Sequence, residues 1–136
     1  MDFAYNDEQK EIIKVVRDLV EKEIVPYASE MDETGKLHEG LLEKLAAQGL
    51  LGVAIPEEFG GAGLDAITIA AIYEELGKGC AGVATTVAAN ALASYPVIIA
   101  GNDDQKKRYF DIINEDNLAA FALTEPGTGS DAGSVS

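Results

Sequence analysis

The chain has 136 residues, a length that suits one domain, and its hydrophobic fraction of 47% is ordinary for a globular protein. Acidic residues outnumber basic residues by 24 to 10, which gives a net charge of −14. Such a surface repels nucleic acids and anionic membranes, because binding them requires many Lys and Arg contacts. We therefore expect neither nucleic-acid binding nor membrane association.

The use of cysteine and the first residues indicate where the protein works. Cys80 is the only cysteine, which fits a reducing compartment: the bacterial cytoplasm or, as the alternative, the mitochondrial matrix. Met1 is followed by acidic and polar residues, so no signal peptide is expected. The most apolar stretch, residues 80–100, is rich in Ala, Gly, Thr, Asn and Ser. We interpret it as a buried helix rather than a membrane span.

Hydrophobic spacing predicts an amphipathic first helix over residues 7–24, started by a capping box of Asn6 and Gln9. Pro26 should end or kink this helix. Its inward positions are expected to be Ile12, Ile13, Val16, Leu19, Val20 and Ile24. Charges four residues apart on the outer side are expected to pair, Arg17 with Glu21 and Asp18 with Lys22.

Further helices are predicted in chain order over residues 38–48, 66–78, 80–99 and 104–113. Gly49 is expected to end the helix at 38–48. Residues 50–64 contain Pro and Gly without a helical period, which predicts a structured loop. Asp65 is expected to cap the third helix, and Asn102 or Asp103 the last. The fourth is apolar nearly all round, so it should be central.

The end of the chain changes character. After Asn117, the run LAAFALT predicts a buried strand. The expected fold is therefore all-α: a bundle of four to five up-and-down helices forms an N-terminal domain over residues 1–116, and residues 117–136 begin a β domain. A lone strand cannot satisfy its ladder hydrogen bonds. We therefore expect a truncated chain, or one completed by another polypeptide.

A loop at residues 124–131, TEPGTGSD, carries the strongest local signal for a ligand. Its glycines allow close approach to the backbone, and its N–H groups and the hydroxyls of Thr128 and Ser130 are neutral donors suited to phosphate oxygens. It lacks the Lys of a Walker loop and has glycines too far apart for the dinucleotide fingerprint. On composition alone, a flexible linker or a tight turn remains open.

Four blocks together resemble the acyl-CoA dehydrogenase family. They are FALTEPGTGSDAGS at 121–134, IPEEFGGAG at 55–63, YEELGKGCAGVATTV at 73–87 and PVIIAGNDDQKKRYF at 96–110. The resemblance implies FAD as cofactor and α,β-dehydrogenation of an acyl-CoA thioester, as in fatty acid β-oxidation. It further implies electron transfer to an electron-transferring flavoprotein and a homotetrameric full-length protein. The catalytic base of the family is a glutamate in a C-terminal helical domain, so no catalytic residue is expected in this chain.

The resemblance also assigns roles to residues in the 121–134 block. Phe121 matches an aromatic residue that packs near the isoalloxazine, although simple core packing remains open for it. Leu123 and Thr124 match positions that contact the pyrimidine side of the flavin. Gly129 and Ser130 match the pyrophosphate turn, and Ser130 also matches a residue that contacts the CoA part of the substrate.

A second set of candidates lies on the fourth predicted helix. Ala84, Thr85, Ala88 and Leu92 share one face, and the two alanines leave a shallow groove. By resemblance these four positions line the acyl cavity, whereas close helix–helix packing explains the alanines equally well.

Other polar residues are weaker candidates. Glu125 is expected to shape the turn beside Pro126 or to make a structural ion pair. His38 is expected to lie on the surface, and Cys80 to pack as a small apolar residue. No His/Cys spacing suggests a metal. Two alternatives to a dehydrogenase stay open: a non-catalytic helical subunit or interaction domain of a split flavoprotein, and an acyl-CoA oxidase-like relative. The isolated chain is expected to be inactive.

Overall fold

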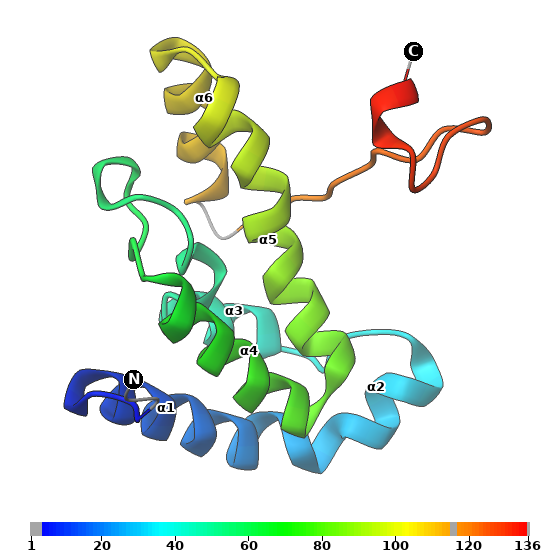
Figure 1. The fold of residues 1–136 in the computed structure, drawn as a ribbon. Coiled ribbons are helices and arrows are strands. Elements are labelled where there is room, and N and C mark those ends of the chain that lie inside the picture. Colours follow the sequence, from blue (N-terminus) through cyan, green and yellow to red (C-terminus); the bar gives the residue numbers. More distant parts are fainter. Residues whose placement is uncertain (1–3, 115–116, 136) are drawn as a thin grey trace.

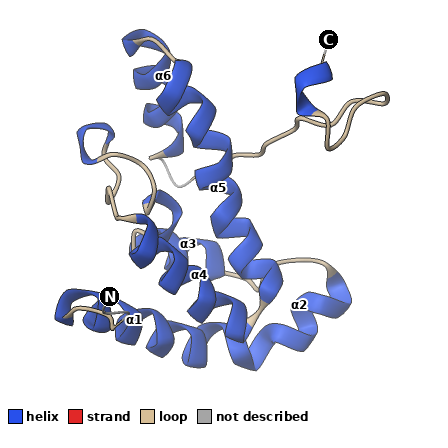
Figure 2. Cartoon of the chain, viewed as in Figure 1, coloured by secondary structure: helices blue, strands red, loops and turns tan. Residues whose placement is uncertain are grey.

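The computed structural model describes residues 4–114 and 117–135, and in these ranges it contains helices and no β-strand (Figure 2). The α-helices are α1 (Asp7–Leu19), α2 (Ala28–Thr34), α3 (Leu41–Ala47), α4 (Ala66–Gly79), α5 (Ala81–Ala100) and α6 (Asp103–Ile113). A π-helix spans Val20–Ile24, and 3-10 helices span Val25–Tyr27, Leu50–Gly52, Glu57–Phe59 and Ala132–Ser134. The all-α fold class is confirmed.

Three of the five predicted helix starts, those of α1, α4 and α6, are confirmed by their caps, whereas the helix predicted from residue 38 begins at Leu41 without a side-chain cap. Asn6 and Asn102 each form a complete capping box with the glutamine three residues on. The Asp65 side chain accepts the N–H groups of Ile67 and Thr68 at the start of α4. Hydrogen bonds from the hydroxyl and the N–H of Thr68 lower the pKa of the Asp65 carboxyl.

The predicted first helix is shorter than expected. Regular α-helix ends at Leu19 and widens into the π-helix, and Pro26, which has no N–H, lies in the following 3-10 turn. The extra residue of the π turn keeps Val20 and Ile24 in the core, 4% and 0% exposed. The sequence pattern missed α2, because Met31 is its one buried residue and the helix therefore shows no apolar period.

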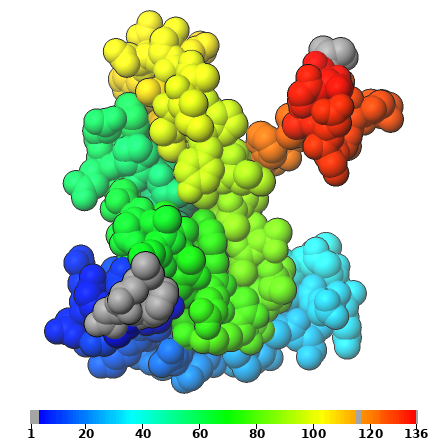
Figure 3. Space-filling view, viewed as in Figure 1, coloured from blue at the N-terminus to red at the C-terminus, as the bar shows by residue number. Residues whose placement is uncertain are grey.

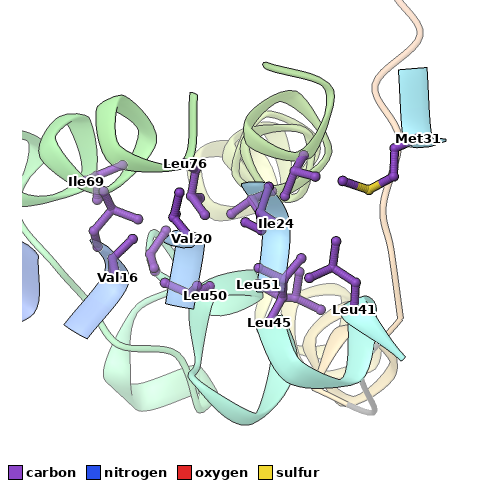
Figure 4. Packing of buried hydrophobic residues seen from close by; sticks show 14 residues of the cluster. Val16, Val20, Ile24, Met31, Leu41, Leu45, Leu50, Leu51, Ile69 and Leu76 are labelled. Atoms are coloured by element: carbon purple, nitrogen blue, oxygen red, sulfur yellow. The ribbon is translucent and has the colours of Figure 1, made fainter. Parts of the chain in front are cut away.

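The main core lies between the α1 region, α3, α4 and α5. Figure 4 shows the inward side chains of the first helical segment, Val16, Val20 and Ile24, lying between two other sets of side chains. One set is Ile69 and Leu76 of α4, and the other is Leu45, Leu50 and Leu51 of the α3 region. The predicted inward face of the first helix is confirmed, with Ile12 and Leu19 packed at the edge of this core. Leu42, Ala46 and Tyr73 of α3 and α4 pack at the same edge.

A smaller second cluster joins α6 to the loop at 53–64. Ile55, Phe110 and Ile113 are buried there, and the rings of Phe59 and Phe110 stack with centroids 4.9 Å apart. Ala119, which follows α6, packs against the same cluster. This cluster therefore holds together the parts of the chain from which the C-terminal segment departs.

The expected pairing of Arg17 with Glu21 is wrong. The Arg17 guanidinium instead donates to both carboxylate oxygens of Glu75 on α4, at 3.1 and 2.9 Å, and Lys78 donates to the same carboxylate at 2.8 Å. Glu75 is only 5% exposed. A buried carboxylate needs charged partners, whereas an exposed pair within one helix contributes little, so the tertiary contact prevails.

Acid should weaken the fold through Glu75. Hydrogen bonds from Arg17 hold the pKa of this carboxyl at about 2, below its ordinary 4.5. Because the folded-state pKa is lowered, the stabilisation is complete above about pH 4.5 and is lost as the pH falls towards 2. We expect roughly 1–3 kcal/mol, after allowing for the solvent screening of the half-exposed cations.

The measurement is the urea unfolding free energy of the chain and of Glu75→Gln between pH 7 and 2.5. Other carboxylates titrate equally in both proteins, so the difference between them isolates Glu75. This difference should shrink as the pH falls. A difference that stays constant over the whole range would contradict the role given to the Glu75 carboxylate.

Candidate functional site

The strand expected at 118–124 does not form. Residues 117–124 belong to no ladder, and backbone groups of 120–124 make no hydrogen bond within the described ranges. The physical reason is that the described residues contain no second strand that could satisfy the ladder hydrogen bonds. Figure 1 shows this segment, in orange, leaving the helices beside α5 and extending away from them.

Beyond this extended stretch, residues 125–134 fold into a tight turn. The N–H of Glu125 donates to the Thr128 carbonyl at 3.0 Å, and the Thr128 N–H donates back to the Glu125 carbonyl at 3.1 Å. The Thr128 hydroxyl donates to the Ser134 carbonyl, and the Ser134 hydroxyl donates to the Asp131 carboxylate. The backbone of Glu125 thus shapes the turn.

The turn leaves its glycines open. A Cβ added to Gly127 or Gly129 would meet nothing within 4 Å, and neither residue has a left-handed φ. The local fold therefore does not require glycine at these positions. The open space beside these two glycines is the space that a ligand needs in order to approach the backbone closely.

The remaining candidates in this segment present unused groups. The hydroxyls of Thr124 and Ser130 are exposed and make no hydrogen bond within the part of the chain that the structure describes. Phe121 and Leu123 are each 42% exposed, so Phe121 does not pack in the core of the described residues. The segment thus offers neutral donors beside apolar side chains.

The second set of candidates lies on α5. Thr85 is exposed and its hydroxyl donates to the Ala81 carbonyl at 2.8 Å, while Leu92 is 50% exposed. Ala88 is half-buried, and Ala84 packs against the edge of the main core. Ala84 therefore serves helix packing in this structure, and the other three lie along a more open face.

That face shows that α5 is buried on one side only. Val83, Val87 and Ala91 face the core, whereas Tyr95 and Ile99 are 43% and 81% exposed. The expectation of a central helix is thus right only for the side of α5 that carries Val83, Val87 and Ala91. By length and composition alone, α5 is also long and apolar enough to cross a membrane.

The two sets of candidates are not brought together. Figure 3 shows the segment that ends the chain standing clear of the helices, joined to them beside α5. Two apolar grooves lie elsewhere: one between α5 and α6 is lined by Val97, Ala100 and Tyr109, and one beside α1 is lined by Val15 and Leu50. Neither groove includes the predicted site residues.

Sequence reasoning missed several buried polar side chains, among them those of Tyr73 and Asn90. The Tyr73 hydroxyl is buried without a hydrogen-bond partner among the described residues, and burial raises the pKa of this phenol to about 12. Asn90 is 0% exposed in the middle of α5 and bonds to the departing segment. Its helical spacing from Val83 and Val87 was the available signal. The described residues contain no group of three or more His, Cys, Asp or Glu that could hold a metal.

Comparison with known proteins identifies the class. Residues 6–114 match the N-terminal domain of acyl-CoA dehydrogenases. The helical fold, the capped helices and the glycine-containing loop at 55–63 all lie in the matched range. The chain belongs to the acyl-CoA dehydrogenase family.

Particular relatives extend the match into the C-terminal segment. A 3-(aryl)acrylate reductase of Clostridium sporogenes is 42% identical over 132 residues, covering 94% of this chain and 35% of the relative. The butyryl-CoA dehydrogenase of Megasphaera elsdenii matches in structure with a TM-score of 0.83 and 34% identity, over 97% of this chain and 36% of that one. An acyl-CoA dehydrogenase of Bacillus anthracis complexed with FAD matches with a TM-score of 0.80 and 38% identity, over 94% of this chain and 22% of that one. The chain thus spans about a third of the length of the curated relative.

Proposed function

We propose that this chain is part of an FAD-dependent acyl-CoA dehydrogenase that catalyses α,β-dehydrogenation of an acyl-CoA thioester. The observations that carry the proposal are the family match and a turn in which the N–H groups of Gly129 and Ser130 make no hydrogen bond within the described ranges. In this proposal residues 1–116 form the N-terminal helical domain, and residues 117–136 begin a β domain. The protein works in the bacterial cytoplasm or, as the alternative, in the mitochondrial matrix.

The turn suits the diphosphate of FAD. The N–H groups of Gly129 and Ser130 make no hydrogen bond within the described ranges, and the Ser130 hydroxyl is equally unused. Within these 136 residues no Lys or Arg follows Arg108, so this segment contributes neutral donors, which hold anionic oxygens in many backbone nests. Gly129 leaves room for the phosphate to approach the backbone.

The extended stretch before the turn suits the flavin ring. The backbone of Leu123 and the hydroxyl of Thr124 supply hydrogen-bonding groups for the pyrimidine edge, and the exposed ring of Phe121 supplies an apolar surface for the isoalloxazine. These groups bind and orient the ring. When bound, FAD accepts the hydride that leaves the β-carbon of the substrate.

The acyl-CoA is proposed to bind between this segment and α5. Ser130 contacts the CoA part, and Ala84, Thr85, Ala88 and Leu92 border the acyl chain with small and apolar side chains. The chain's contribution is to position the substrate, and the base that removes the α-proton is proposed to lie outside it. We propose an electron-transferring flavoprotein as electron acceptor and a homotetramer as the assembly. The reductase relative acts on an acrylate and so supports a carbon–carbon double bond as the reacting group.

The isolated 136-residue chain should show no turnover of short acyl-CoAs and little binding of FAD, since it presents one side of the site. The full-length gene product should be yellow and should reduce an artificial electron acceptor with acyl-CoA. Absorbance at flavin wavelengths and steady-state assays measure both. A colourless full-length protein that takes up no FAD would instead favour the non-catalytic subunit, and rapid reoxidation of its reduced flavin by oxygen would favour the oxidase-like relative.

Gly129→Ala separates ligand approach from folding. In the isolated chain its free energy of unfolding in urea should stay within about 0.5 kcal/mol of that of the parent, because the new methyl group meets nothing within 4 Å. In the full-length protein the Kd for FAD should rise at least about tenfold, because the methyl group lies where the diphosphate approaches. An unchanged Kd would contradict the placement of the diphosphate at this turn.

A further inference from the structure

Asn90 links three parts of the chain through one side chain. Its Nδ2 donates to the Leu51 carbonyl at 3.3 Å and to the Asn117 carbonyl at 3.5 Å, while its Oδ1 accepts the Ala119 N–H at 2.7 Å. Both donor hydrogens and one acceptor position of the amide are therefore used. All three bonds leave α5, and two of them go to the segment that follows α6.

The bond to Ala119 is the last hydrogen bond that holds this segment before Glu125 within the described residues. Within residues 117–124 Ala119 alone is half-buried and the others are exposed. It packs against the cluster of Ile55, Phe110 and Ile113. Its N–H is the last backbone group before Glu125 with a hydrogen-bond partner in the described residues.

The anchor lies close to the proposed flavin-contacting residues. Phe121 follows Ala119 by two residues, which at roughly 3.3 Å per extended residue places it about 7 Å farther along the chain. Since residues 120–124 make no hydrogen bonds of their own, the direction in which they leave is set at Ala119. Where Ala119 is held determines where Phe121 and Leu123 can reach.

We infer that Asn90 is a positioning residue: its buried amide fixes the departure of the 117–124 segment and thereby the placement of Phe121 and Leu123 against the flavin. This inference rests on the proposed function. Asn90 acts through the backbone of Ala119 and does not itself touch the cofactor. Its full burial in α5 makes it a rigid anchor, because both the helix and the surrounding core restrict the amide.

Amide hydrogen exchange in the isolated chain tests the anchor directly. In the parent chain the Ala119 N–H should exchange at least about a hundredfold more slowly than the N–H of Leu123, and its proton resonance should lie downfield because of the short bond. Asn90→Leu keeps the volume but removes the acceptor, so Ala119 should exchange as fast as Leu123. Ser94→Ala is the matched control, because Ser94 is also 0% exposed on α5. Among the described residues its hydroxyl donates to the Asn90 backbone carbonyl and lies 3.4 Å from the Tyr109 hydroxyl, and it makes no bond to the 117–124 segment.

FAD binding by the full-length protein tests the functional consequence. Asn90→Leu should raise the Kd for FAD at least tenfold and lower kcat at saturating FAD with a smaller change in KM, whereas Ser94→Ala should leave these constants within about twofold. If Asn90→Leu fails to fold, Ala119→Pro serves in its place, because it removes the N–H donor without changing α5. It should then raise the Kd for FAD and lower kcat in the same way.

The outcomes separate the inference from the proposed function. If Ala119 loses its protection while FAD binding and kcat stay at the parent values, the positioning role is overturned and the proposed function stands. Retained protection of Ala119 in Asn90→Leu overturns the anchor itself. A parent protein that binds no FAD overturns the proposed function, and with it the positioning role, although the exchange experiment still reports the bond.

Discussion

Replacing Gly61 with alanine is expected to destabilise the chain by about 3 kcal/mol or more, the upper range for overpacking a buried site. A Cβ at this position would overlap the carbonyl oxygen and the Cβ of Ile55. Ile55 cannot move aside, because it is 1% exposed in the second cluster and its carbonyl accepts the Gly63 N–H at 2.8 Å. The glycine in the 55–63 block is thus explained by close approach of two backbone segments.

Urea unfolding of the isolated chain measures this loss, and Gly127→Ala is the matched control. Gly127 has no left-handed φ and open space around its Cα, so its replacement should shift the unfolding free energy by less than about 0.5 kcal/mol. If Gly61→Ala were as well tolerated as Gly127→Ala, the packing of the loop against Ile55 would be wrong.

Truncating Leu76 to alanine should cost about 2–5 kcal/mol, the range for removing a large aliphatic side chain from a rigid core. Leu76 is 0% exposed on α4 and belongs to the cluster that includes Val20 and Ile24. The surrounding helices cannot collapse into the space: at nearby Gly79, an added Cβ would already come within 2.6 Å of Val20. The cavity therefore remains and adds its own penalty.

Ile67→Ala on the same helix provides the comparison for Leu76→Ala. Ile67 is 63% exposed, so its loss should change the unfolding free energy by no more than about 0.5 kcal/mol. Both variants are measured by urea unfolding at pH 7. Equal effects in the two would mean that α4 does not present Leu76 to the core.

Features that depend on nearby residues were predictable from the sequence. Asn6 and Asn102 cap their helices through groups three residues away, and Gly49 follows α3 in the left-handed conformation expected after a helix end. The tight turn at 125–128 was one of the two open readings of a stretch containing Pro126 and Gly127, and the structure forms it. Such interactions are short in sequence, so their pattern is visible in the chain.

Features that depend on residues distant in the sequence were not predictable in this way. Arg17 had a suitable neighbour in Glu21, yet it binds Glu75, because only the packed helices bury that carboxylate. The run at 118–124 has the composition of a strand but no strand to pair with in the described residues. Asn90 looked like one more polar residue in an Ala-rich helix until the segment after α6 was seen to return to it.

The sequence by itself determined the helical class, the inward faces of the helices and the family, because apolar periodicity, caps and motif blocks are local or colinear properties. The tertiary structure decided which charged groups pair, which side of α5 stays open and where the segment carrying Phe121 leaves the helices. Those outcomes depend on which surfaces lose contact with water when the helices pack, and burial of that kind is a property of the whole fold.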